Sequence, residues 1–249
     1  TDDLSKVLDK ADLDKAPVAT IVEDGKSKPA SSQPVLEGTK LTWSGKLEVG
    51  EQVVIVYSVK VKAGGEGKIV NNVASSTATP PVGPPITPPE VVTEHPIPGY
   101  TLTKSSDPVT GSTVQPNSKI TYTVTGTNTG ATVLDPVVIT DDMSKVLAHA
   151  ALVGAPTATI INADGGKTTA AAPVVNGTTI KWTGKLDKGE RVELVYTVQV
   201  NADAASVTLK NVVTSTATPP GGGELTPPPG TTTHEVPPAP VKPTPTPTP

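Results

Sequence analysis

Stretches in which hydrophobic and polar residues alternate recur along most of the chain. Residues 120–124, 179–183 and 191–200 show the alternation most clearly, with Ile, Val, Leu, Tyr or Trp at every second position. A period of two is typical of β-strands that bury one face. Residues rich in Gly, Pro, Asn and Asp separate these stretches, as expected of turns. The pattern predicts an all-β fold, in which only residues 142–151 could form one short helix or a loop.

The same sequence unit occurs twice in the chain. Thr1–Leu8 reappears as Thr140–Leu147, and this offset of 139 residues continues without a gap to Pro98 and Pro237. Of the 98 pairs of positions, 46 are identical. Such self-similarity indicates one fold unit that is present in two copies.

The two copies differ in completeness. Residues 99–139 contain further alternating stretches that precede the second copy, and nothing corresponds to them before Thr1. Residues 99–237 therefore form a complete unit, and residues 1–98 form the same unit without its opening strands. Seven to nine short strands per unit predict tandem immunoglobulin-like β-sandwich domains.

The incomplete first unit leaves one edge of a predicted sheet open. Open edges tend to pair with other strands. The gap is either a boundary of the sequence in hand, or another chain fills it by supplying strands to residues 1–98. After the second unit, residues 238–249 are rich in Pro and Thr, which predicts a stiff polyproline spacer.

Composition excludes several classes of function. With 20 Lys and Arg against 24 Asp and Glu, the chain lacks the positive charge of a nucleic-acid binder. No apolar run reaches the roughly 18 residues of a membrane-spanning helix, so no direct membrane insertion is expected. The sequence has neither a Gly-rich phosphate loop nor a His cluster, so no cofactor and no metal are expected. His95 and His234 are interpreted as single exposed histidines.

Aromatic residues make up only 2% of the chain, and Cys is absent. Trp182 and Tyr196 are therefore expected to fill the core of the second unit as packing residues. The scarcity of aromatic side chains argues against an exposed patch that binds a ligand. The absence of Cys removes disulfides as a means of stabilisation.

Three polar residues of the second unit suggest a covalent cross-link. Lys104 shares a strand face with Leu102, and a lysine on an inward face is rare unless it is paired. Asn211 opens a strand rich in Val and Thr, and Asp141 ends another strand. Burial lowers the pKa of a lysine and raises the pKa of an aspartate, so the amine becomes nucleophilic and the acid can polarise an amide carbonyl. Attack of the amine on Asn211 would form an amide and release ammonia.

A purely structural interpretation of these residues is also open. Lys104 could extend to solvent, Asn211 could bond to the backbone, and Asp141 could cap the following turn. The repeat places Asp2 and Asn72 at the positions of Asp141 and Asn211, but the first unit has no opening strand that bears a lysine. No cross-link can therefore form within the first unit of this chain.

Five short segments of the second unit carry a family resemblance: Leu102–Pro108, Gly111–Pro116, Ile120–Val124, Asn128–Gly130 and Thr140–Asp142. They resemble the repeat modules of Gram-positive and actinobacterial surface proteins, namely DUF11-like domains and stalk domains of the collagen-adhesin type. The resemblance covers residues 99–237 fully and residues 1–98 in part. Some modules of this type form Lys–Asn isopeptide bonds that are assisted by an Asp or a Glu.

The resemblance also implies a role for each candidate residue. Lys104 is implied as the nucleophile and Asn211 as the side chain attacked. Asp141 is implied as the assisting acid, with Asp142 as the second candidate.

These observations predict a structural role. The chain is expected to be a stalk or repeat region of an extracellular, cell-wall-attached adhesin of a Gram-positive bacterium, with neighbouring repeats of the same protein as its partners. Two alternatives are a self-assembling filament or sheath subunit completed by a donor strand, and an adhesin module that itself binds a ligand. Apart from the single-turnover cross-link, no enzymatic activity is expected.

Overall fold

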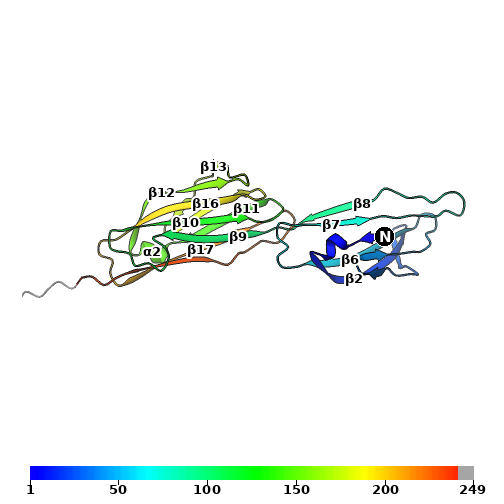
Figure 1. Ribbon diagram of the computed structural model, residues 1–249, viewed down its shortest axis with the longest axis horizontal. Helices are drawn as coiled ribbons and strands as arrows, with labels where there is room; N and C mark the ends of the chain where they lie inside the picture. The colour runs from blue at the N-terminus through cyan, green and yellow to red at the C-terminus, as the bar shows by residue number, and fades with distance from the viewer. Residues whose placement is uncertain (241–249) are drawn as a thin grey trace, which may run out of the picture. The chain divides into compact units, whose positions relative to one another are not determined.

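The computed structural model describes residues 1–240, which form two units of antiparallel strands (Figure 1). The first unit comprises Thr1–Ile97, and the second begins at Pro98. The all-β fold predicted from the alternation of residues is confirmed. Most of the predicted polyproline spacer, residues 241–249, lies outside the described residues.

The second unit is a sandwich of two five-stranded antiparallel sheets. The first sheet has the order β13-β12-β16-β10-β9, with β9 (Tyr100–Asp107), β10 (Lys119–Asn128), β12 (Ala150–Ile161), β13 (Lys167–Thr169) and β16 (Arg191–Val200). The second sheet has the order β14-β15-β11-β17-β18, with β11 (Leu134–Asp142), β14 (Val174–Asn176), β15 (Thr179–Leu186), β17 (Val207–Ala217) and β18 (Gly230–Val236). The second unit has ten strands, more than the predicted seven to nine, because the three-residue strands β13 and β14 extend one edge of each sheet.

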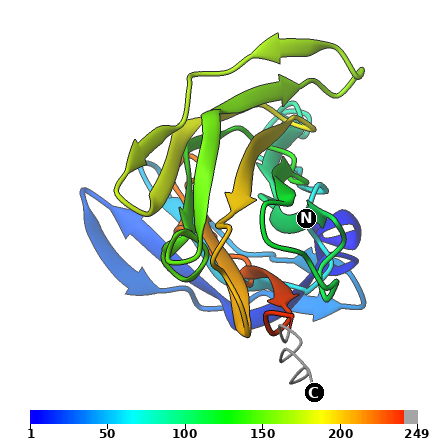
Figure 2. The same cartoon turned by 90° about the vertical axis from the view of Figure 1, so that its left-hand side faces the viewer.

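The core of the second unit lies between the two sheets, which Figure 2 shows from the end of the unit. On β16 every second side chain from Val192 to Val200 is buried, as the alternation predicts. Trp182 is 2% exposed, and its indole Nε1 donates a hydrogen bond to the carbonyl oxygen of Ala171 at 3.1 Å. Its ring covers Gly184, where an added Cβ would lie 2.3 Å from a ring atom. The predicted packing role of Trp182 is confirmed.

The first unit contains the same two sheets with two strands fewer. One sheet has the order β4-β5-β1-β7-β8, with β1 (Asp2–Asp3), β4 (Val35–Glu37), β5 (Lys40–Thr42), β7 (Ile69–Ala74) and β8 (Val91–Pro96). The other has the order β3-β2-β6, with β2 (Ala11–Glu23), β3 (Lys26–Pro29) and β6 (Gln52–Val61). Within residues 1–240, β6 has no partner on the side where its counterpart β16 pairs with β10.

Each unit also contains one helix of four residues, α1 (Ser5–Leu8) and α2 (Ser144–Leu147). Residues 142–151, for which the sequence allowed a helix or a loop, form α2 and then enter β12 at Ala150. No helix among residues 1–240 has the length and apolar character needed to cross a membrane.

Candidate cross-linking site

The three candidate residues of the second unit come from strands of both sheets. Lys104 lies on β9, Asp141 on β11 and Asn211 on β17. Strands β11 and β17 are neighbours in one sheet, whereas β9 belongs to the facing sheet. The sequence suggested that Asn211 opens a strand, but it lies in the middle of β17. Pairing with β18 extends β17 back to Val207.

Lys104 faces inward, as its alternation with Leu102 predicts. Its side chain is 0% exposed, whereas the neighbouring residues Thr103 and Ser105 face solvent. At this point β9 and β18 approach closely, since a Cβ on Gly230 would lie 2.8 Å from the Cβ of Lys104. The absence of a side chain at Gly230 therefore makes room for the lysine strand, and the interpretation in which Lys104 extends to solvent is wrong.

One hydroxyl group connects the three candidate side chains. The Nζ atom of Lys104 contacts Oδ2 of Asp141 and donates a hydrogen bond to the hydroxyl of Tyr196 at 2.9 Å. That hydroxyl donates to Oδ2 of Asp141 at 2.6 Å, and it accepts a hydrogen bond from Nδ2 of Asn211 at 2.7 Å. The structure thus brings amine, acid and amide into one hydrogen-bonded group, which we call the Lys104 cluster: Lys104, Asp141, Tyr196 and Asn211.

The polar role of Tyr196 was missed by sequence reasoning, which assigned it to packing alone. Tyr196 is 3% exposed, and its ring centroid lies 5.2 Å from that of Tyr122, so the packing role is confirmed. Its hydroxyl is nevertheless the centre of the Lys104 cluster. The available signal was the recurrence of this residue as Tyr57 in a chain with only 4 Tyr.

Burial shifts the ionisation of the cluster toward neutral groups. Removal from water lowers the pKa of Lys104 and raises the pKa of Asp141. The ring centroids of Tyr122 and Tyr196 lie 5.3 Å and 5.5 Å from the Nζ atom, so aromatic surface surrounds the amine. A neutral amine has a free electron pair, and a neutral carboxyl group has a proton to donate. These are the forms that an acid-assisted nucleophilic attack requires.

Two buried oxygen atoms of the cluster, Oδ1 of Asp141 and Oδ1 of Asn211, have no hydrogen-bond partner among the described residues. An unpaired buried polar atom costs about 1–3 kcal/mol, so such atoms are few in native proteins. If Asp141 carries a proton, its carboxyl group can donate a hydrogen bond, and Oδ1 of Asn211 can accept one. A hydrogen bond to Oδ1 polarises the amide carbonyl and makes its carbon easier to attack. The cluster therefore contains each group needed to form an amide bond.

Asp142, the second candidate acid, lies outside the cluster. The alternation of β11 buries Val137, Ile139 and Asp141 and turns Asp142 to solvent. There its Oδ1 accepts a hydrogen bond from the backbone N–H of Ser144 at 2.9 Å, which lowers the pKa of Asp142. Asp142 is thus an ionised residue at the start of α2 and has no contact with the lysine.

His234 is buried, so the prediction of an exposed histidine is wrong for this residue. It is 0% exposed, and its Nε2 lies 3.2 Å from Oγ of Ser106 and 3.0 Å from the carbonyl oxygen of Pro108. Ser106 belongs to β9, so these contacts hold that strand against β18. The counterpart His95 is exposed, because the first unit has no such strand. In the part of the chain that the structure describes, no three His, Asp or Glu side chains gather as a metal site.

The first unit contains the same arrangement of acid, tyrosine and amide. The hydroxyl of Tyr57 donates to Oδ2 of Asp2 at 2.8 Å. The Nδ2 atom of Asn72 lies 2.9 Å from that hydroxyl and 3.2 Å from Oδ2 of Asp2. Oδ1 of Asp2 and Oδ1 of Asn72 are again buried without a partner in residues 1–240. All three residues are only half-buried, and no residue among 1–97 corresponds to Lys104.

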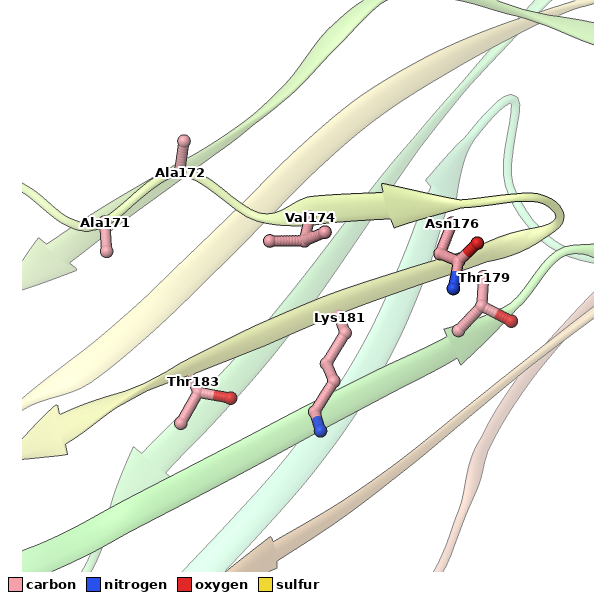
Figure 3. A pocket seen from close by; sticks show the side chains of 7 residues that line it. All are labelled: Ala171, Ala172, Val174, Asn176, Thr179, Lys181 and Thr183. Atoms are coloured by element: carbon pink, nitrogen blue, oxygen red, sulfur yellow. The ribbon is translucent and has the colours of Figure 1, made fainter.

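A shallow groove of about 600 Å³ follows β14 and β15 of the second unit (Figure 3). Small and polar side chains line it: Ala171, Ala172, Val174, Asn176, Thr179, Lys181 and Thr183. No residue of the Lys104 cluster lines this groove, and its lining contains neither a carboxylate nor an imidazole. It therefore lacks the side chains of an acid–base site.

Fold and cluster together define the class of protein: tandem immunoglobulin-like β-sandwich repeats, of which the second buries a Lys–Asp–Asn group. The chain belongs to the family described as "Domain of unknown function (DUF7927)", which matches residues 1–97 and again residues 99–236. This double match agrees with the internal repeat. None of the curated proteins matches the chain.

Several solved structures are similar to this chain at low sequence identity. BspA_C_WT has a TM-score of 0.49 and 13% identity, over 93% of this chain and 86% of that one. A D312A form of BcpA, the major pilin subunit of Bacillus cereus, has a TM-score of 0.47 and 11% identity, over 89% and 65% of the two chains. The collagen-binding domain from a Staphylococcus aureus adhesin has a TM-score of 0.36 and 10% identity, over 55% and 96%.

Proposed function

We propose that this chain is a structural stalk segment of an extracellular bacterial surface protein, and that an isopeptide bond between Lys104 and Asn211 stabilises its second unit. The observation that carries the proposal is the Lys104 cluster, in which a buried amine, a buried acid and a buried amide share one tyrosine hydroxyl. Attachment to the cell wall of a Gram-positive bacterium follows from the resemblance to surface-protein repeats and belongs to the same proposal.

The bond forms by attack of the neutral Lys104 amine on Cγ of Asn211. Asp141 donates its proton toward Oδ1 of Asn211 as negative charge develops on that oxygen. The Cγ–Nδ2 bond then breaks, one hydrogen of the attacking amine moves to Nδ2, and ammonia leaves. Amine and primary amide thus become secondary amide and ammonia, and the proton returns to Asp141. The fold contributes by holding the reacting groups together.

The position of the bond suits a protein that bears tension. Lys104 lies on the first strand of the second unit, and Asn211 lies on the last strand but one. Tension between the ends of the unit passes through the bond and bypasses most of the residues between them. Closing a loop of about 100 residues stabilises a fold by about 4.7 kcal/mol on the chain-entropy model. Because the chain has 0 Cys, the amide bond takes the place of a disulfide.

In this role the chain acts through neighbouring repeats of the same protein. The cross-link is a single turnover whose product stays in the fold, so the chain is not an enzyme with an external substrate.

Single-molecule pulling of the full chain tests the proposed role. If the bond is present, the residues between Lys104 and Asn211 cannot extend. About 100 residues then do not contribute to the measured extension, which is shorter by about 350 Å. The Asn211→Ala variant should release this length, and Asn72→Ala, the matched change in the first unit, should not. Equal extension of the wild type and Asn211→Ala would overturn the proposal.

A further inference from the structure

The cross-link proposed for the second unit requires a hydrogen to pass between two nitrogen atoms. The hydrogen leaves Nζ of Lys104 and ends on Nδ2 of Asn211, which departs as ammonia. A nitrogen that leaves with a negative charge is a very poor leaving group, so Nδ2 has to gain this hydrogen while its bond to Cγ breaks. The reaction therefore needs a group that contacts both nitrogen atoms.

The hydroxyl of Tyr196 contacts both of them. It accepts a hydrogen bond from Nζ of Lys104 at 2.9 Å and another from Nδ2 of Asn211 at 2.7 Å. Within residues 1–240 it is the only group that forms a hydrogen bond with this Nδ2 atom. Asp141 contacts the lysine amine, but it forms no hydrogen bond with Nδ2 in this part of the chain. The geometry thus gives the path between the two nitrogen atoms to the tyrosine.

We propose that Tyr196 is a catalytic residue of the cross-linking reaction, in which its hydroxyl accepts a proton from Nζ of Lys104 and donates its own proton to the departing Nδ2 of Asn211. The proposal rests on the isopeptide bond proposed for the second unit. It divides the chemistry between two side chains, since Asp141 acts on the amide oxygen and Tyr196 acts on the nitrogen atoms.

The hydrogen bonds of Asp141 support this division. Its Oδ2 atom accepts a hydrogen bond from the Tyr196 hydroxyl at 2.6 Å and also contacts Nζ of Lys104. An oxygen that accepts from two donors is a poor place for the proton of the acid itself, so the proton of neutral Asp141 belongs on Oδ1. That atom and Oδ1 of Asn211 are both buried and unpaired among the described residues. The proton of the acid therefore serves the amide oxygen.

The steps balance without any further reactant. The electron pair of the neutral Lys104 amine forms a bond to Cγ of Asn211, so Nζ becomes positively charged and Nδ2 gains a free electron pair. The hydroxyl hydrogen of Tyr196 then turns from Asp141 to Nδ2, and the hydroxyl takes one hydrogen from Nζ in exchange. The bond between Cγ and Nδ2 breaks and ammonia leaves. Nζ keeps one hydrogen in the secondary amide, and Tyr196 is unchanged.

The surroundings of Tyr196 favour an exchange in a single step. The residue is 3% exposed, and burial raises the pKa of Tyr196, because removal from water disfavours the charged tyrosinate. The hydroxyl therefore does not give up its hydrogen before it receives another. Two hydrogen atoms move together, and this property can be measured.

The test follows the formation of the cross-link in the full chain over time. The chain is produced by cell-free translation, purified at once in denaturant and refolded by dilution, while tryptophan fluorescence follows folding. Intact mass under denaturing conditions then gives the fraction of chains that have lost about 17 Da. We expect Tyr196→Phe, which keeps the ring, to fold and to form the bond about 100-fold more slowly than the wild type, as is typical when a general acid–base group is removed.

Two control variants remove other tyrosine hydroxyls. Tyr122→Phe keeps a ring near the lysine amine and removes a buried hydroxyl that has no hydrogen-bond partner among the described residues. Tyr57→Phe is the matched change in the first unit. Both variants should form the bond at the wild-type rate.

Refolding in mixtures of H2O and D2O separates proton transfer from mere positioning of Asn211. The rate is read after the fluorescence has reached its final value. Because two hydrogen atoms move in one step, the wild-type rate should fall along a curve as the deuterium fraction rises, and Tyr196→Phe should lose this curvature. A straight line for the wild type, or the same curve for Tyr196→Phe, would overturn the inference.

The mass measurements separate the inference from the proposed function. If the wild type loses one ammonia and Tyr196→Phe does so at the same rate, the inference is wrong and the cross-link stands. Equal slowing of Tyr196→Phe and Tyr122→Phe also overturns the inference, because any lost hydroxyl then has the same effect. If the folded wild type keeps the full sequence mass, the proposed cross-link fails and the role of Tyr196 fails with it.

Discussion

The two units hold the same acid, tyrosine and amide, yet they bury these groups to different degrees. In the second unit Asp141 and Asn211 are 0% exposed and Tyr196 is 3% exposed, whereas the three counterparts in the first unit are half-buried. The residues of the site are the same in both, so the difference comes from β9 and β10. The opening strands therefore supply both the lysine and the burial that lowers its pKa.

The largest effect is expected from Asp141→Ala in the second unit. This change removes the assisting acid and leaves the buried Lys104 amine without this partner, which costs about 1–3 kcal/mol beyond the lost cross-link. We expect a loss of unfolding free energy on the order of 7 kcal/mol, measured by denaturant unfolding of the full chain. The matched Asp2→Ala should cost about 1 kcal/mol, since no buried lysine depends on Asp2. Equal losses would contradict the comparison.

The next prediction separates the contribution of the cross-link from that of the contact between Lys104 and Asp141. Asn211→Ala removes the electrophile but keeps Lys104 beside Asp141, so the expected loss is close to the loop-closure value of about 5 kcal/mol. Asn72→Ala should cost less than about 1 kcal/mol, because the first unit has no bond to lose. Protease digestion at increasing temperature provides a second readout, in which only Asn211→Ala should digest faster than the wild type.

Truncation of a core side chain should also cost more unfolding free energy in the second unit than in the first, but the difference should be smaller. Leu194 on β16 is 0% exposed, and its counterpart Ile55 on β6 is half-buried. Leu194→Ala is expected to cost about 4 kcal/mol, and Ile55→Ala about 1 kcal/mol, because a cavity opens only where the side chain is enclosed. Urea unfolding followed through Trp182 and Trp43, one in each unit, measures both changes. A similar cost at the two positions would mean that the open face is covered in solution.

The smallest change in unfolding free energy is expected from the titration of Tyr100 at alkaline pH. Burial raises the pKa of Tyr100 from 10.0 to about 12. A group whose pKa is higher in the folded state contributes its stability below pH 10 and loses it as the pH rises toward 12. The second unit should lose about 3 kcal/mol across this range through Tyr100. Unfolding at pH 9, 10 and 11 tests this, and Tyr100→Phe should reduce the slope by about one third, because burial also raises the pKa of Tyr122 and the pKa of Tyr196. If the unfolding free energy of Tyr100→Phe falls with pH as steeply as that of the wild type, Tyr100 does not contribute to the dependence.

The alternation of residues predicts much of the fold and part of the site. The inward direction of Lys104 follows from its phase with Leu102, which β9 confirms. The choice of Asp141 over Asp142 could also have been made from phase, since Val137, Ile139 and Asp141 share one buried face of β11. A period of two fixes which face of a strand a residue occupies.

Alternation along a strand does not predict which residues of the two sheets contact one another. The burial of His234 depends on Ser106 and Pro108, which follow from the docking of β9. The hydrogen bonds of Tyr196 join strands from both sheets, and these partners lie 55 or more residues away in Asp141 and Lys104. Phase shows which side of a strand faces inward, but it does not show which residue lies opposite.

The intact mass of the purified, folded chain tests the central claim most directly. If Lys104 and Asn211 are joined, the measured mass lies about 17 Da below the mass computed from the sequence, because one ammonia has left. Asp141→Ala and Asn211→Ala should each restore the full mass, and Asn72→Ala should not. A folded wild-type chain with the full sequence mass would contradict the account and would leave the Lys104 cluster as a buried hydrogen-bond network.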